Sequence, residues 1–446
     1  KAAEIVPSPR QVAWNCMEFY GFVHFGLYTF DREHEFATGP EIFNPVNFDA
    51  RQWVKAYKAA GMTGLLLTCK HHEGFCLWPS KYTEFSVKNS PWKDGKGDIV
   101  KEVSEACREE GLKFGVYLSP WDVHEETYGT PAYNDYFCNQ LTELCSNYGE
   151  LFCVWFDGAC RTADKVQGYD WDRYYSLIRK LQPNACISIC GPDVRWIGNE
   201  AGESREEEWS VVPKSIMVTE RNPGYWRQLD TMPNSTWKDI GSRDFIKDYD
   251  ELIWYPAEVD VSIRPSWGYV EGEEKQLYSL ETLLYMYEKA VGGNATLLLN
   301  VPPNKEGLFD LEDVERLAEL GKAIRGLFSR PQTTVAKAFQ KNGSNAEAIL
   351  DADRTHFVEL AGECQEIEIQ LQGEHTIDFI VLKETIEKGQ RVEKFAVDIW
   401  REDQWKEIYQ ATTIGYQRFG RIEPVQTERV RVRILESRGT VYLKEI

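Results

Sequence analysis

Short apolar runs alternate with longer amphipathic stretches over the first 330 residues, and this alternation constrains the fold most strongly. Short apolar runs predict buried strands, and the amphipathic stretches between them predict helices, so the chain should build βα units around a parallel sheet. The predicted strands are residues 21–30, 64–70, 113–118, 152–156, 185–190, 259–263 and 295–301. The predicted helices are residues 50–60, 98–110, 133–148, 171–181 and 277–291.

Seven predicted strands, with an eighth expected near residues 216–219, favour a (β/α)8-type barrel, which is an α/β fold that usually needs about 250 residues or more. The main alternative is an open doubly wound sheet. No G-x-G-x-x-G motif follows the first strand, and the strands outnumber those of such a sheet. We therefore expect the barrel to span residues 1–330.

The pattern changes after a further helix-like stretch at residues 311–328. Apolar residues then recur with period two, as in the Val-Arg-Val-Arg-Ile run at 430–434, and turn residues separate the runs. This pattern predicts a C-terminal β-sandwich over residues 335–446. The linker is expected at residues 329–333.

Charge and composition exclude several classes of partner. The net charge of −20 would repel nucleic acids and anionic lipids, so a neutral small molecule or sugar fits better. No apolar run approaches the roughly 18 residues of a membrane-spanning helix. The 11 cysteines are widely spaced and suit buried apolar positions, although one or two disulfides remain possible. The oligomeric state stays open.

The first residue is Lys1 rather than Met, which suggests that a preceding segment such as a signal peptide has been removed. This start favours a periplasmic or secreted location.

Histidines recur where the predicted strands end. His24 lies in the first strand, His71 and His72 end the second, and His124 follows the third. One such histidine alone is more often a buried residue with a backbone hydrogen bond than a site residue, but recurrence at successive strand ends favours a site. We do not predict a metal, because H-E-x-x-H is absent and adjacent histidines on a strand project apart.

Carboxylates also follow the predicted strands. Asp157 comes directly after the fourth strand, and Glu200 lies in a glycine-rich loop after the fifth. An acid at such a position is either a paired structural group or a site residue, and a barrel favours the site. Two such carboxylates suit a glycosidase, which needs a nucleophile or base and an acid. Arg264 and Trp267 would then bind hydroxyls and stack on a sugar face.

Five ordered motifs carry a resemblance to a known family. They are Val-His-Phe-Gly at 23–26, Lys-His-His-Glu-Gly-Phe at 70–75, Tyr-Leu-Ser-Pro-Trp-Asp at 117–122, Val-Trp-Phe-Asp-Gly at 154–158 and Gly-Asn-Glu at 198–200. Together they resemble the α-L-fucosidases of glycoside hydrolase family 29. The likeness is greatest to the bacterial subgroup that acts on α-1,3- and α-1,4-linked fucose.

The resemblance implies a retaining mechanism on a barrel, without a cofactor, acting on a fucosylated oligosaccharide or glycoconjugate. It makes Asp157 the nucleophile and Glu200 the acid/base, which a retaining enzyme holds about 5–5.5 Å apart. The family's substrate-binding positions correspond to His24, His71, His72, Tyr117 and Trp121. The family's usual Arg-Glu-Trp-Gly is here Arg-Glu-His-Glu at 32–35, so Glu33 keeps its place while the tryptophan is missing.

Several alternatives remain open at the level of sequence. The barrel could be an exo-glycosidase for another deoxy or galacto sugar, or a non-catalytic sugar-binding protein that kept the pocket. The C-terminal segment containing residues 414–422 resembles a discoidin or galactose-binding-like module. Such a module either binds sugar or only packs against the barrel, and we favour packing because many appendages have no open site.

Overall fold

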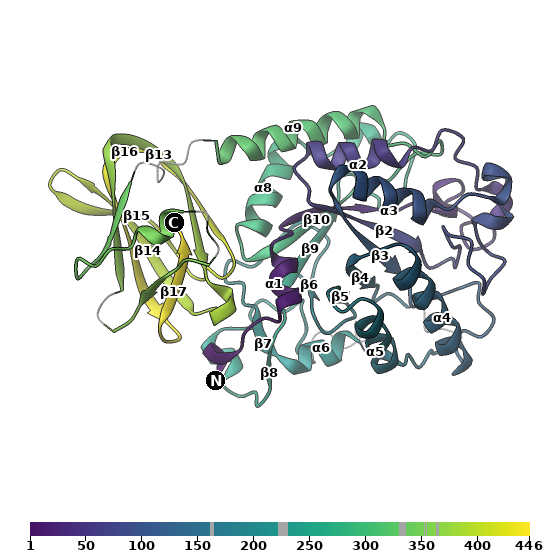
Figure 1. The fold of residues 1–446 in the computed structure, drawn as a ribbon, viewed down its shortest axis with the longest axis horizontal. Coiled ribbons are helices and arrows are strands. Elements are labelled where there is room, and N and C mark those ends of the chain that lie inside the picture. Colours follow the sequence, from purple (N-terminus) through teal and green to yellow (C-terminus); the bar gives the residue numbers. More distant parts are fainter. Residues whose placement is uncertain (161–164, 222–230, 330–335, 352, 354, 363–364) are drawn as a thin grey trace.

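The computed structural model describes residues 1–160, 165–221, 231–329, 336–351, 353, 355–362 and 365–446. It contains a barrel and a separate C-terminal antiparallel sheet that lies beside it (Figure 1). The predicted fold class, an α/β barrel followed by a β-sandwich, is therefore confirmed.

Eight parallel strands among the described residues follow one another around the barrel in chain order. β1 pairs with both β2 and β10, and a parallel bridge between Ser188 and Val194 links the end of β5 to the start of β6. This bridge closes the sheet into a barrel. The strands are β1 Phe19–Val23, β2 Gly64–Lys70, β3 Lys113–Leu118, β4 Leu151–Phe156, β5 Cys186–Ile189, β6 Arg195–Trp196, β9 Ala257–Ser262 and β10 Ala295–Asn300.

Helices follow most of the strands and cover the outside of the barrel (Figure 1). Several begin at a capping side chain, as where Asp98 accepts a hydrogen bond from the backbone N–H of Lys101 at the start of α3. Gly111 ends α3 in a left-handed conformation with φ +78°, which glycine adopts without strain. The helices are α1 Pro9–Asn15, α2 Ala50–Ala59, α3 Ile99–Glu110, α4 Ala132–Asn147, α5 Trp171–Leu181, α8 Leu280–Val291 and α9 Leu311–Leu327.

Two strand predictions are corrected by the structure. Residues 216–219 lie in helix α6 (Lys214–Glu220), and the missing barrel strand is β6, whose two residues are too short to show a pattern. An excursion between β6 and β9 holds α6, α7 (Arg243–Ile246) and the antiparallel pair β7 (Val211–Pro213) and β8 (Leu252–Trp254). The first strand ends at Val23 rather than residue 30, so His24 lies just beyond the strand.

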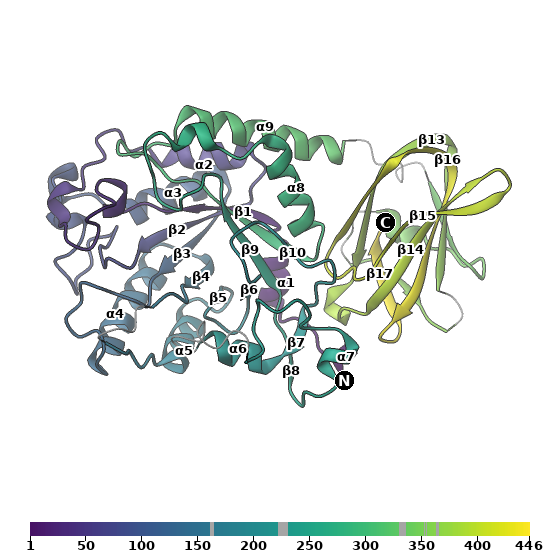
Figure 2. The same ribbon diagram turned by 180° about the vertical axis from the view of Figure 1, so that it is seen from behind.

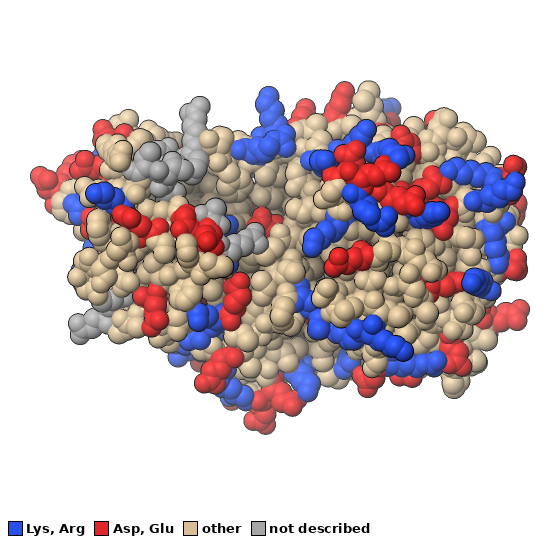
Figure 3. All heavy atoms as spheres, in the orientation of Figure 1, with Lys and Arg blue, Asp and Glu red and all other residues tan. Residues whose placement is uncertain are grey.

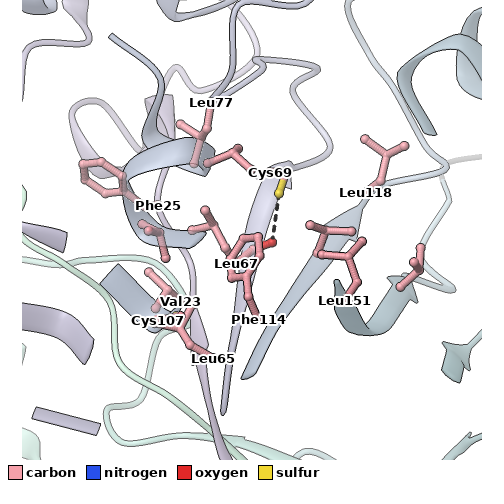
Figure 4. Packing of buried hydrophobic residues seen from close by; sticks show 14 of the residues in the cluster. Val23, Phe25, Leu65, Leu67, Cys69, Leu77, Cys107, Phe114, Leu118 and Leu151 are labelled. Carbon is pink, nitrogen blue, oxygen red and sulfur yellow. Dashed lines mark hydrogen bonds between the residues drawn. The ribbon is translucent and has the colours of Figure 1, made fainter. Parts of the chain in front are cut away.

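The core has two layers that follow the alternation of strand residues. Leu65 and Leu67 point toward the helices and pack with Cys107 of α3 and Phe114 of β3 (Figure 4). Leu66 points the other way, into the barrel interior. The same alternation in β9 sends Ala257, Val259 and Val261 into the outer layer, and it directs the acids at 258 and 260 toward the barrel interior.

The C-terminal strands form an antiparallel sheet around their own hydrophobic core. Its order is β12-β17-β13-β16-β14-β15, and β11 also pairs with β13. The predicted linker lies outside the described residues except for Ser329. The strands are β11 Lys337–Gln340, β12 Val358–Leu360, β13 Glu366–Glu384, β14 Val392–Arg401, β15 Gln404–Ala411, β16 Arg418–Ser437 and β17 Val441–Glu445.

Helix α8 lies on the side of the barrel that faces this sheet in both views (Figures 1 and 2). On the face drawn in Figure 3, acidic and basic side chains are interspersed rather than gathered into one basic surface. The ten cysteines among the described residues are all free, so the disulfides that the sequence left open do not form among them. No helix in the described ranges has the length and apolar character needed to cross a bilayer.

Candidate active site

A cavity of about 560 Å³ opens at the carboxyl ends of the barrel strands, where active sites of such barrels lie. Its walls come from residues at or just beyond the ends of β1, β2, β4, β5, β6 and β9. The lining residues are Phe22, His24, His71, His72, Trp155, Asp157, Gly158, Ala159, Ile189, Cys190, Trp196, Gly198, Glu200, Thr236, Asp260 and Trp267. Both predicted catalytic carboxylates and the three predicted sugar-binding histidines therefore share one cavity.

Asp157 is held by two hydrogen bonds directly after β4. Its Oδ2 accepts from the Tyr117 hydroxyl at 2.9 Å, and its Oδ1 accepts from the backbone N–H of Ala159 at 2.7 Å. His72 Nε2 lies 3.7 Å from Oδ2. The side chain is 25% exposed, so the carboxylate is fixed in place and still open to the cavity.

His24 is a neutral group in this site. Its Nδ1 donates to Asn300 Oδ1 at 2.8 Å, which leaves Nε2 as a hydrogen-bond acceptor. Burial, and after it the neighbouring His71, lowers the pKa of His24 to about 3. The ring therefore stays uncharged at any ordinary pH, and it suits a sugar hydroxyl better than an anion.

His72 is oriented by a chain of hydrogen bonds behind it. Ser119 Oγ donates to the Trp121 carbonyl at 2.6 Å, so the same oxygen accepts from His72 Nδ1 at 2.7 Å. The Trp121 ring also lies against His72, with ring centroids 4.7 Å apart. These contacts turn His72 Nε2 toward Asp157. Trp121 is thus placed behind the cavity rather than in its wall.

His71 stacks on Tyr117 and faces a buried carboxylate. The two rings are nearly parallel with centroids 5.7 Å apart. His71 Nδ1 lies 3.6 Å from Glu73 Oε2, and neither carboxylate oxygen of Glu73 has a hydrogen bond among the described residues. Glu73 lies in the motif at 70–75, but the sequence alone does not indicate that it faces the site.

Glu200 reaches the cavity from the loop after β6. It is exposed, and its Oε2 accepts a hydrogen bond from Trp267 Nε1 at 3.1 Å. The loop turns at Gly198, which has φ +109°, and a Cβ there would lie 2.1 Å from the Ser235 carbonyl oxygen. Glycine is therefore needed for the backbone to pass this point and carry Glu200 to the cavity.

The structure adds a third carboxylate, Asp260, to the cavity wall. Asp260 lies on β9, is 4% exposed, and accepts a hydrogen bond from Trp196 Nε1 at 2.7 Å. Burial, and after it the charges of Glu258 and Glu200, raises the pKa of Asp260 well above its usual range. The cavity therefore need not carry three negative charges. The alternation of side chains along β9, which places residue 260 on the inner face of the barrel, was the sequence signal for Asp260.

Two of the predicted substrate-binding residues lie elsewhere. Glu33 is exposed and is not among the residues that line the cavity. Arg264 is fully buried and forms ion pairs with Asp310 at 2.7 Å and Asp313 at 2.5 Å. Its guanidinium thus joins the end of β9 to α9 and its N-terminal loop. Sequence could not distinguish this structural ion pair from a sugar contact.

His71, His72 and Asp157 also satisfy the geometry of a metal site. One ligand atom from each lies within 4.8 Å of the others. We refer to these three residues as the histidine–aspartate group. The same placement suits a carboxylate nucleophile beside imidazoles that bind sugar hydroxyls. Treatment with a chelator distinguishes this arrangement from a metal site.

Comparison with known proteins identifies the family. The α-L-fucosidase family model matches residues 11–325. Alpha-L-fucosidase 1 of Arabidopsis thaliana is 37% identical over 432 residues, which are 93% of this chain and 81% of that protein. The human plasma alpha-L-fucosidase is 25% identical over 301 residues, covering 64% of this chain and 55% of that protein.

Solved structures agree over the whole chain. A glycoside hydrolase 29 family member from an unknown rumen bacterium gives a TM-score of 0.82 at 35% identity and covers 100% of this chain and 78% of that chain. A Ruminococcus gnavus GH29 fucosidase in complex with fucose gives a TM-score of 0.86 at 29% identity, over 99% of this chain and 94% of that one. The chain therefore belongs to the α-L-fucosidases of glycoside hydrolase family 29 and is a glycoside hydrolase.

Proposed function

We propose that the protein is a retaining exo-α-L-fucosidase that removes terminal L-fucose from glycans by double displacement. Asp157 is the nucleophile and Glu200 is the acid/base. The observation that carries this proposal is the presence of both carboxylates in one cavity, at different strand ends and beside three histidines and two tryptophans at the strand ends. Retaining glycosidases use two carboxylates in this way.

In the first step Asp157 attacks the anomeric carbon of fucose and forms a covalent ester. The hydrogen bonds from Tyr117 and Ala159 hold the carboxylate for this attack. Glu200 donates its proton to the leaving glycosidic oxygen. Because Trp267 donates to Oε2 of Glu200, the transferable proton resides on Oε1.

In the second step Glu200, now ionised, removes a proton from water, and the resulting nucleophile hydrolyses the ester at Asp157. The exposure of Glu200 supports this role, because water and the departing sugar must both reach it. Two inversions at the anomeric carbon release fucose with its original α configuration.

The residues around the two acids suit one small deoxy sugar. His24 offers a neutral acceptor to a hydroxyl, and His71 and His72 stand beside it. Phe22 and Trp155 provide apolar wall, which suits the ring face and the methyl group of a deoxy sugar. Phe22 and Trp155 belong to the packed cluster inside the barrel, so the cavity meets buried side chains at its inner end, which supports cleavage at a chain end.

We also propose α-1,3 or α-1,4 linkage to the rest of the glycan. This preference is supported by the motif resemblance to the subgroup with that specificity. A panel of fucosylated oligosaccharides that differ only in linkage tests it. Preferred hydrolysis of α-1,2- or α-1,6-linked fucose would contradict the linkage proposal and leave the mechanism intact.

Product analysis tests the reaction itself. Aryl glycosides of L-fucose, galactose and xylose should be compared, and only the fucoside should turn over rapidly. Proton NMR during the first turnovers should show α-L-fucose before mutarotation. Initial formation of the β anomer would contradict the retaining mechanism, and faster turnover of galactoside or xyloside would contradict fucose specificity.

A further inference from the structure

The chain that follows Glu200 has no regular structure of its own. Residues 197–210 are all described and form no helix or strand between β6 and β7. We call residues 199–210 the acid-loop segment. The Asn199 side chain holds the first turn through the backbone of residues 201 and 203, and beyond that turn the path depends mainly on groups from elsewhere in the molecule.

Helix α8 supports the first part of the acid-loop segment. Gly202 has φ +77° and lies so close to α8 that a Cβ would be 2.7 Å from Met286 Cγ. Ser204 Oγ donates to the Lys289 carbonyl near the end of α8 at 2.7 Å. The segment is thus fixed to the barrel within four residues of Glu200.

The C-terminal sheet supports the next part. The carbonyl oxygen of Glu206 accepts two hydrogen bonds, from Thr412 Oγ1 at 3.0 Å and from Arg418 Nη1 at 2.7 Å. Both donors belong to the sheet domain, and both bind the backbone rather than the side chain of the segment. They therefore fix the path of the chain irrespective of side-chain rotation.

A buried glutamine of the sheet domain holds the end of the segment. Gln390 Nε2 donates to the Glu208 carbonyl at 3.0 Å, and Gln390 Oε1 accepts from the backbone N–H of Ser210 at 2.8 Å. Gln390 is fully buried. The sheet domain thus supplies side chains to backbone groups at three positions of a segment that begins beside Glu200.

We propose that Arg418 and Thr412 are positioning residues for catalysis and that the C-terminal sheet holds the acid-loop segment so that Glu200 meets the leaving oxygen. This inference rests on the proposed acid/base role of Glu200. Under this proposal the C-terminal sheet supports the reaction without binding sugar itself.

The test uses a double variant, Arg418→Ala with Thr412→Val, in the full chain. Both side chains are half-buried, and the backbone pairing of β16 does not depend on them. Two aryl fucosides of similar size are compared: the para-nitrophenyl fucoside, whose leaving group departs unaided, and the phenyl fucoside, which needs protonation. A displaced acid should slow the phenyl substrate by on the order of tenfold while changing the para-nitrophenyl substrate little.

Arg421→Ala is the matched control. Arg421 also lies on β16 and also joins the sheet to the barrel, through an ion pair with Glu288 of α8, but no hydrogen bond or ion pair among the described residues joins its side chain to the acid-loop segment. It should lower the melting temperature without changing the ratio of the two substrates. Equal ratios in the double variant and in Arg421→Ala, whether both changed or both unchanged, would overturn the proposal.

Glu200→Gln is measured alongside to separate the two levels of the argument. If it shows strong dependence on the leaving group and the double variant does not, the positioning role is wrong and the acid/base assignment stands. If Glu200→Gln shows no such dependence, the acid/base assignment itself is wrong, and the positioning proposal falls with it.

Discussion

Lys70 and Asp122 form a buried ion pair between the end of β2 and the loop that follows β3. Lys70 is the last residue of β2 and precedes His71, and Asp122 follows Trp121. Their side chains are 0% and 1% exposed, and Lys70 Nζ lies 2.8 Å from Asp122 Oδ2. We predict that Lys70→Met strongly destabilises the barrel, because it leaves the carboxylate of Asp122 buried without its cation.

The magnitude follows from what remains around Asp122. Breaking a buried pair on one side typically costs 3–5 kcal/mol, and methionine preserves most of the packing volume, so the charge dominates. Asp122 Oδ1 keeps two backbone donors, the N–H groups of His124 and Glu125. We therefore expect Lys70→Met to lower the unfolding free energy by about 3 kcal/mol, which is the lower end of this range.

Urea and thermal unfolding measure this loss, with Lys58→Met as the control. Lys58 pairs with Glu110 at 3.2 Å, but its side chain is 54% exposed, so the same substitution there should cost less than about 1 kcal/mol. Adding Asp122→Asn to Lys70→Met removes the unpaired charge and should recover part of the stability. Equal losses at Lys70 and Lys58, or no recovery in the double variant, would refute the reasoning.

Three further predictions concern the site and its pH dependence. Glu200→Gln should be slowed about 10²–10⁴-fold on a natural fucosyl oligosaccharide. Azide should accelerate the turnover of an activated aryl fucoside by this variant and give α-fucosyl azide. Glu203→Gln should show neither effect. Prolonged EDTA treatment should leave activity unchanged, because we assign the histidine–aspartate group to sugar and nucleophile roles. Burial raises the pKa of Glu258 from 4.5 to about 7, so the unfolding free energy should fall as the pH rises across this interval, and Glu258→Gln should make that fall smaller, because other buried acids such as Glu384 also contribute to it.

Each of these has a contrary result. Azide rescue in Glu203→Gln, with Glu200→Gln near wild type, would transfer the acid/base role. Activity that is lost with EDTA and restored by zinc or calcium would show that the histidine–aspartate group binds a metal. For Glu258, the folded protein keeps its proton up to about pH 7 while the unfolded chain releases it near 4.5. Unfolding measurements in which the wild type and Glu258→Gln have the same pH dependence would contradict this linkage.

The sequence predicted the barrel well wherever a strand was long and apolar. β2 and β3 occur at the predicted residues, 64–70 and 113–118, because all of β2 and all of β3 after Lys113 are buried between helices and barrel interior. β6 was missed because a strand of two residues has no periodicity to detect. The helix at 214–220 was taken for a strand because its short apolar stretch suits either element.

The site residues that lie at or just after strand ends could be predicted from the sequence. His24, His71, His72, Asp157, Glu200 and Trp267 all line the cavity. Tyr117 and Trp121 contact these residues from behind, a distinction that depends on side-chain direction. The ion pairs of Arg264 and the exposure of Glu33 could not be predicted, because a sequence does not reveal which carboxylates an arginine will meet or which side of a loop faces solvent.

The most direct test of the central claim is to trap the covalent intermediate and find where it forms. A fucosyl donor fluorinated at carbon 2 slows both steps, and a good leaving group lets the ester accumulate. We predict that digestion and mass spectrometry will locate one fucosyl adduct on Asp157, and that a folded Asp157→Ala protein will neither be labelled nor turn over substrate. An adduct on another residue, or near-normal hydrolysis by folded Asp157→Ala, would contradict the assignment.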